Sequence, residues 1–155
     1  MKNLFILSVS LMTCIQLSGQ AITRSQNIYS YTLHLVGHFT YENDSLSDVH
    51  IQMVGKDDAY PETNEFETLF SGTPIEMYNF LIALEKFSVE PEGTSTDLNN
   101  GQTHVTIWKL LGKKVVIYAE NEISYTLVPP KTIPLAKEKY VAWCKKNNIQ
   151  FENAN

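Results

Sequence analysis

The sequence predicts an α+β fold in which a five- to six-stranded, mostly antiparallel sheet carries two packed helices, in the order βββαβββα. Short segments that alternate between apolar and polar residues recur along the chain, and this alternation is typical of half-buried strands. Two longer segments have helical spacing instead. No linker is long enough to separate domains, and closely spaced hairpins with few helices favour an antiparallel sheet with helices on one face.

The first 21 residues have the features of an export signal. Lys2 supplies a positive n-region, and the apolar run 4–12 has the length of a signal h-region but is too short to span a bilayer. Gly19 and Ala21 place small residues at the −3 and −1 positions of a cleavage site. We therefore expect a signal peptide over 1–21, a single α+β domain over 22–155, and a periplasmic or secreted location.

The two cysteines refine this expectation. Residues 11–14 loosely resemble a bacterial lipobox, although Met12 and Thr13 depart from the small residues which that motif prefers. Lipid attachment at Cys14 is therefore the less favoured alternative. Cleavage after residue 21 leaves Cys144 as the single thiol, so that no internal disulfide can form. Stability then has to come from an apolar core, for which ~134 residues suffice.

Three strands are expected before the first helix. Residues 28–35 and 49–53 alternate cleanly between apolar and polar side chains, and residues 65–70 do so more weakly. If the first two strands pair through a loop over 37–47, then His34 lies opposite His50. A long loop does not fix that register.

The first helix has the clearest boundary signals in the chain. Thr73, Pro74 and Glu76 combine a capping box with proline at the first helical position. Apolar side chains occupy most of the circumference up to Phe87. We therefore expect a helix over 74–87 that is buried on most sides.

A second group of three strands is expected after a loop over 88–102. The strands are predicted at 104–110, 114–119 and 123–127, and Gly112-Lys113 is expected to be the centre of the hairpin between the first two.

The closing helix is expected over 133–147, with Thr132 as its cap. An apolar stripe with helical spacing should face the core. It includes Cys144, for which we favour a buried core position over a nucleophilic role, because a helix C-terminus does not activate a thiol. The stripe consists of Ala136, Tyr140, Trp143 and Cys144.

Composition narrows the classes of function. The net charge is −5, and Arg24 is the single arginine against 11 lysines. Because arginine is the preferred ligand for phosphates and base edges, a nucleic-acid partner is not expected. The sequence contains no run of 18 apolar residues, so no transmembrane segment is expected in the mature chain. The motifs GxSxG, HExxH and CxxC and the Gly-rich phosphate loop are absent. We therefore assign no catalytic residue, metal ligand or cofactor, and the oligomeric state stays open.

Two histidines give an alternative function. His34 and His50 fall on the polar sides of their strands, and Asp48 lies in phase with His50. Opposed residues of an antiparallel pair have Cβ atoms ~5 Å apart, close enough to share a metal ion. The alternative is a small envelope hydrolase or metal-binding enzyme that uses His34, His50 and Asp48 on the exposed sheet face. Two surface histidines are the simpler interpretation, because zinc sites need three or four protein ligands.

An acidic segment is the strongest compositional asymmetry. Eight of the 17 carboxylates lie between Glu42 and Glu67, with Lys56 as the only base among them. The simplest interpretation is a solvated face that keeps the protein soluble; a low-affinity calcium site is another. We favour a docking surface for a basic protein partner, which makes the chain a non-enzymatic binding protein such as an inhibitor or immunity-type protein. The expected partner-binding residues are Asp44, Asp48, Asp57, Asp58, Tyr60, Glu62, Glu65 and Glu67.

Overall fold

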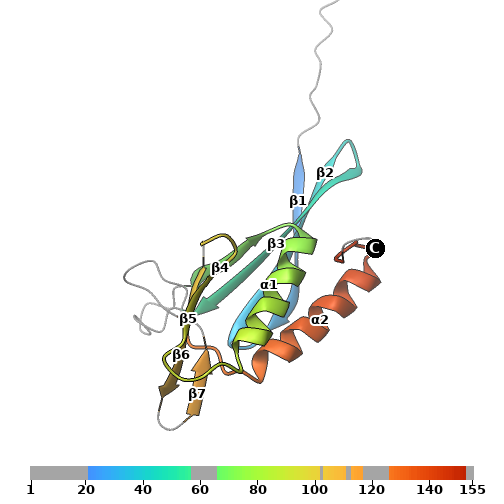
Figure 1. The fold of residues 1–155 in the computed structure, drawn as a ribbon. Coiled ribbons are helices and arrows are strands. Elements are labelled where there is room, and N and C mark those ends of the chain that lie inside the picture. The colour runs from blue at the N-terminus through green and yellow to red at the C-terminus, as the bar shows by residue number, and fades with distance from the viewer. Residues whose placement is uncertain (1–20, 57–65, 102, 111–112, 117–125, 153–155) are drawn as a thin grey trace, which may run out of the picture.

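The computed structural model describes residues 21–56, 66–101, 103–110, 113–116 and 126–152. Within them the order of elements is ββββαβββα (Figure 1). One four-stranded sheet consists of β1 (Ile22–Ser30), β2 (Leu33–Glu42), β3 (Ser45–Lys56) and β4 (Phe66–Gly72), in chain order. A three-stranded sheet consists of β5 (Ser95–Leu98), β6 (Thr103–Leu110) and β7 (Lys113–Val116). The helices are α1 (Pro74–Phe87) and α2 (Thr132–Lys146). The predicted α+β class with antiparallel pairing is confirmed.

The first predicted strand is in fact two strands. Residues 28–35 run across a tight turn at Tyr31 and Thr32, which separates β1 from β2. Apolar residues keep the same odd-numbered phase on both sides of that turn, so the alternation gives no sign of the break. Most of the loop expected over 37–47 belongs to β2 and β3 instead.

The turn between β2 and β3 lies at residues 43–44 and not at the centre of the loop expected over 37–47. This difference changes the register between β2 and β3. His50 lies opposite His38, and His34 lies opposite Val54. The predicted pairing of His34 with His50 is therefore wrong by four residues. An even shift keeps every side chain on its predicted face of the sheet, so the face was assigned correctly and the neighbour was not.

The segment after α1 also contains a strand that the sequence does not reveal. The loop expected over 88–102 includes β5, which pairs with β6. In the next hairpin Lys113 pairs with Leu110, so Lys113 is a strand residue rather than a central turn residue. The end of the strand expected at 114–119 and most of the one expected at 123–127 lie outside the described residues.

Helix α1 begins as the sequence predicts. The Thr73 side chain accepts a hydrogen bond from the Glu76 backbone N–H, and the Glu76 carboxylate accepts one from the Thr73 backbone N–H at 2.8 Å. Helix α2 differs, because Thr132 lies inside its first turn and the preceding residue makes no side-chain cap. The carbonyls of Pro129 and Pro130 accept the first N–H groups of α2 instead, which removes the need for a capping side chain.

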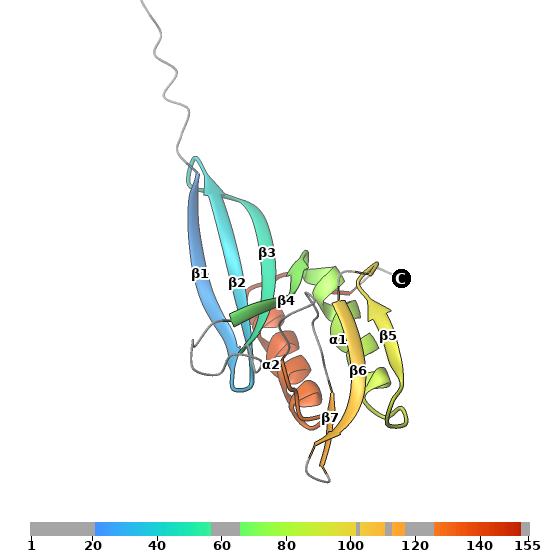
Figure 2. The ribbon, with the colours of Figure 1, turned by 90° about the vertical axis from the view of Figure 1, so that its left-hand side faces the viewer.

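The two helices lie side by side on one face of the four-stranded sheet (Figures 1 and 2). Helix α2 contacts β1 and β2, whereas α1 contacts β3 and β4 and, on its other side, β5. The Thr103 hydroxyl at the start of β6 donates to the Leu69 carbonyl of β4 at 2.6 Å and so joins the two sheets. Among the described residues, neither helix is long and apolar enough to cross a membrane.

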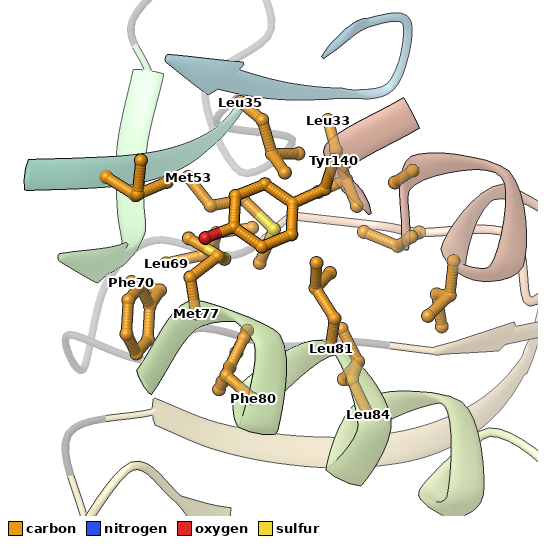
Figure 3. Close-up of a cluster of buried hydrophobic side chains, with 14 of the residues drawn as sticks. Leu33, Leu35, Met53, Leu69, Phe70, Met77, Phe80, Leu81, Leu84 and Tyr140 are labelled. Atoms are coloured by element: carbon orange, nitrogen blue, oxygen red, sulfur yellow. The ribbon is translucent and has the colours of Figure 1, made fainter. Parts of the chain in front are cut away.

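The core lies between the helices and the odd-numbered residues of β2 and β3. Figure 3 shows the Tyr140 ring of α2 among strand side chains such as Leu35 and Met53 and the α1 side chain of Met77. The Tyr140 hydroxyl donates to the Pro74 carbonyl at 2.7 Å, which satisfies the one polar atom of this buried ring. The predicted α2 stripe is confirmed, because all of its members are buried: Ala136, Tyr140, Trp143 and Cys144.

Candidate functional site

The face of the four-stranded sheet that points away from the helices carries three histidine–serine pairs. The Nδ1 atoms of His34 and His38 lie 2.8 and 2.9 Å from the hydroxyls of Ser30 and Ser25 on β1, and the Nε2 atom of His50 lies 2.6 Å from that of Ser71 on β4. These are cross-strand neighbours, which the pleat brings together. Each imidazole is therefore held by a neutral hydroxyl, an arrangement that by itself supplies no acid–base pair.

This geometry does not unite the three residues of the predicted enzyme site. His34 lies four residues along the sheet from His50, about 13 Å at the rise of a strand, which is too far for one first-shell metal site. The neighbour of His50 is His38, with ring centroids 6.5 Å apart. Within the described ranges, no three His, Cys, Asp or Glu side chains are grouped so that they could hold a metal ion.

His38 is the histidine that sequence reasoning missed. It was assigned to the loop between the first two strands, but it shares the even-numbered phase of His34 and His50. Extending the alternation beyond residue 35 would have found it.

The sheet extends past the helices as an arm, which consists of residues 22–24 of β1 and the hairpin 40–48 of β2 and β3 (Figure 2). Phe39 packs on Trp143 of α2, with ring centroids 5.4 Å apart, and it is the last buried residue of β2 before the turn. The turn itself has positive φ at Asn43 and Asp44. Positive φ at both central residues of a two-residue hairpin turn matches the right-handed twist of the flanking strands.

The arm has an apolar strip on the face that the helices cover elsewhere. Ile22 pairs with Tyr41, and Tyr41 pairs with Leu46, so the three side chains are neighbours on one face. Ile22 and Leu46 are 53% and 50% exposed. The Arg24 guanidinium lies 5.2 Å from the centre of the Tyr41 ring, which is the distance of a cation–π contact.

Carboxylates lie close to this strip along the arm, although Asp48 is on the opposite face of the sheet, in phase with His50. Glu42 and Asp44 are exposed at and beside the turn, and Asp48 is exposed on β3. Within the described part of the chain, none of the three carboxylates forms an ion pair. The arm therefore presents an apolar centre with carboxylates that are free to meet a cationic surface.

The structure separates the predicted partner-binding residues that it describes. Asp44 and Asp48 lie on the arm, whereas the Glu67 backbone pairs with Gly55 near the other end of β3, about 23 Å from Asp48 at the rise of a strand. The others lie outside the described residues: Asp57, Asp58, Tyr60, Glu62 and Glu65.

Cys144 takes no part in either surface. It is a free thiol that is fully buried in the core, and burial raises the pKa of the thiol. A raised pKa disfavours the nucleophilic thiolate. The interpretation as a core cysteine is confirmed.

Comparisons with models of protein families, with curated proteins and with solved structures find no match for this chain. Its function therefore has to be inferred from the chemistry of its own surfaces.

Proposed function

We propose that this protein is an exported, non-enzymatic binding protein, of the inhibitor or immunity type, which engages a basic protein partner through an acidic surface. The observation that carries the proposal is the arm, where Ile22 and Leu46 are exposed beside the partly buried Tyr41 and close to carboxylates that form no ion pair with a described residue. An apolar centre with a polar rim is the usual anatomy of a protein–protein interface.

The arm residues have complementary roles in this proposal. Tyr41 is the aromatic anchor, because tyrosines are enriched among the residues that contribute most to binding. Asp44 and Asp48 form the acidic rim, together with Glu42. Rim charges of this kind act mainly on association, with rate gains of ~10–10³ at low salt.

The acidic residues that follow Lys56 in the chain also belong to the proposal. Asp57, Asp58, Glu62, Glu65 and Glu67 add to the negative charge that steers a basic partner, and Tyr60 is a candidate anchor among them. Substitutions in the arm and in this acidic segment can tell which of the two the partner meets first.

Capture from the native host tests the partner. The protein should retain a basic protein, and Asp44→Asn/Asp48→Asn should slow its association and flatten the salt dependence. Glu92→Gln/Glu138→Gln removes the same charge from exposed sites outside the arm and is the matched control. Equal association rates for the two double variants would reject the arm as the contact, and failure to retain any protein would reject the binding function.

The exported location has its own test. Mass spectrometry of the protein from its native host should show a chain that starts at Ile22, after removal of the leader. A chain that starts at Met1 in the cytosolic fraction would contradict the proposal. A lipid mass on Cys14 would instead place the protein at a membrane surface.

A further inference from the structure

A hollow of about 270 Å³ lies at the end of the sheet opposite the arm, beside the turn between β1 and β2. We call it the Tyr31 hollow; its walls are Tyr31, Thr32, His34, Lys56, Phe66 and Leu127. The turn is at the lower end of β1 and β2 in Figure 1. The hollow shares no residue with the arm.

The walls of the Tyr31 hollow are mainly aromatic. Tyr31 is 67% exposed and Phe66 is 54% exposed, although both belong to residue types that normally bury their rings. The His34 imidazole holds the Phe66 ring edge to face, with centroids 5.1 Å apart and planes at 88°. A hydrogen bond with Ser30 fixes the orientation of the His34 ring, and the Phe66 ring packs against this oriented imidazole.

The polar groups of the hollow are few and distinct. Among the described residues of the lining, Lys56 is the only one with a permanent charge, and its ammonium forms no ion pair with a described carboxylate. The Thr32 hydroxyl is the one buried side-chain polar atom in the described part of the chain that lacks a hydrogen-bond partner. An unsatisfied buried group of this kind is rare in folded proteins, and this one belongs to a residue of the wall of the hollow.

Size and chemistry together define the ligand. An apolar cavity of ~150 Å³ holds benzene, so the Tyr31 hollow has room for one ring and a small polar substituent. The volume is below the ~300–1,000 Å³ that drug-sized ligands occupy. Aromatic walls favour a flat ring, and a single ammonium favours a single negative charge.

We propose that the Tyr31 hollow binds a small aromatic carboxylate, whose ring packs against Tyr31 and Phe66 and whose carboxylate pairs with the Lys56 ammonium. The ligand then bridges the β1–β2 turn and the adjoining ends of β3 and β4.

Titration of the purified protein with benzoate, followed by NMR chemical shifts and calorimetry, tests the site. Benzoate should bind in the millimolar range or tighter, with shifts centred on Tyr31, His34 and Phe66. Lys56→Gln should weaken benzoate binding by about tenfold or more, because it removes a charge-assisted hydrogen bond. Benzamide, the uncharged analogue, should bind more weakly to the wild type and be affected less than about twofold by the same substitution.

Lys131→Gln is the matched control for charge. Lys131 lines a second hollow, of about 440 Å³, on the other side of Tyr31, so its replacement removes the same charge nearby without touching the Tyr31 hollow. Phe66→Ala changes an exposed side chain and should weaken both ligands while leaving the thermal midpoint nearly unchanged.

Three results would overturn the proposal. They are the absence of benzoate binding at about 10 mM, equal affinities for benzoate and benzamide, and equal losses in Lys56→Gln and Lys131→Gln. Asp44→Asn/Asp48→Asn on the arm should leave benzoate binding unchanged, so failure of this site and failure of the partner contact are distinguishable.

Discussion

The two ends of the four-stranded sheet are built from the same strands but differ in cover and in charge. At the arm, Ile22 and Leu46 are exposed beside the partly buried Tyr41, and the exposed Asp44 lies in the adjoining turn. At the turn between β1 and β2, aromatic side chains surround Lys56 in a hollow. Between the two ends, the same odd-numbered face of β2 is buried under the helices.

Element length explains why the arm lacks cover. Helix α2 has 15 residues and α1 has 14, so each is only about 21–23 Å long. Strand β3 has 12 residues and spans about 40 Å. Helices of this length cannot cover such strands from end to end, and the residues beyond Phe39 lose their cover although their sequence pattern does not change.

The largest effect that we expect is a difference in the free energy of unfolding between a substitution in the covered part of the sheet and one in the arm. Leu35 is fully buried on β2, and Leu46 is half exposed on the arm. Leu35→Ala should lower the free energy of unfolding by about 2–5 kcal/mol, because it leaves a cavity, whereas Leu46→Ala should change it by less than about 0.5 kcal/mol. Chemical denaturation of the two variants measures both values. Similar losses would show that the arm is part of the packed core.

The next effect is a slower association with a basic partner, which tests whether the partner meets the arm or the acidic segment after Lys56 first. Asp57→Asn/Asp58→Asn/Glu62→Gln removes three charges that follow Lys56 in the chain. The triple variant should slow association by about tenfold at low salt and flatten the salt dependence, with little change in thermal stability. Rapid-mixing kinetics with the captured partner measure this beside Asp44→Asn/Asp48→Asn. Unchanged kinetics in both variants would reject the acidic-surface mechanism.

A smaller effect appears in the pH dependence of stability. The backbone N–H and the side chain of Thr73 hold the pKa of Glu76 below its ordinary value of 4.5. The stabilisation is therefore complete above that ordinary value and is lost as the pH falls through the lower pKa of the folded state. Glu76→Gln should flatten the loss of stability below about pH 4.5, as followed by thermal unfolding across pH.

The smallest effect lies in the turn of the arm. Asp44 has a φ of 61°, a conformation that glycine adopts freely and alanine does not. Asp44→Gly should change the free energy of unfolding by less than about 0.5 kcal/mol, whereas Asp44→Ala should cost about 1 kcal/mol. Equal stabilities in chemical denaturation would contradict the left-handed conformation at this residue.

Much of the fold could be predicted because it depends on local chemistry. The start of α1 follows from the reciprocal hydrogen bonds of Thr73 and Glu76, which involve residues three apart. The buried stripe of α2 follows from helical spacing, and the face of each strand residue follows from a period of two. These features depend on near neighbours along the chain, so the sequence alone determines them.

Other features were decided only when distant segments packed together. The turn at Tyr31 interrupts an alternation that continues in phase on both sides, so that the break, the register and the pairing of His38 with His50 could not be derived from it. Thr132 has the residue type of a cap but lies buried in the first turn of α2, where the carbonyls of Pro129 and Pro130 accept the N–H groups of Thr132 and Ile133.

Both candidate sites belong to this second class. The arm exists because two helices are shorter than the strands that they cover, and the Tyr31 hollow brings together residues from β2, β3 and β4 with Leu127. The sequence determined which side chains are polar, apolar or charged and on which face of the sheet each one lies. Only the tertiary structure decided which of them are covered and which meet, because cover and proximity depend on the lengths and positions of elements that are distant in the chain.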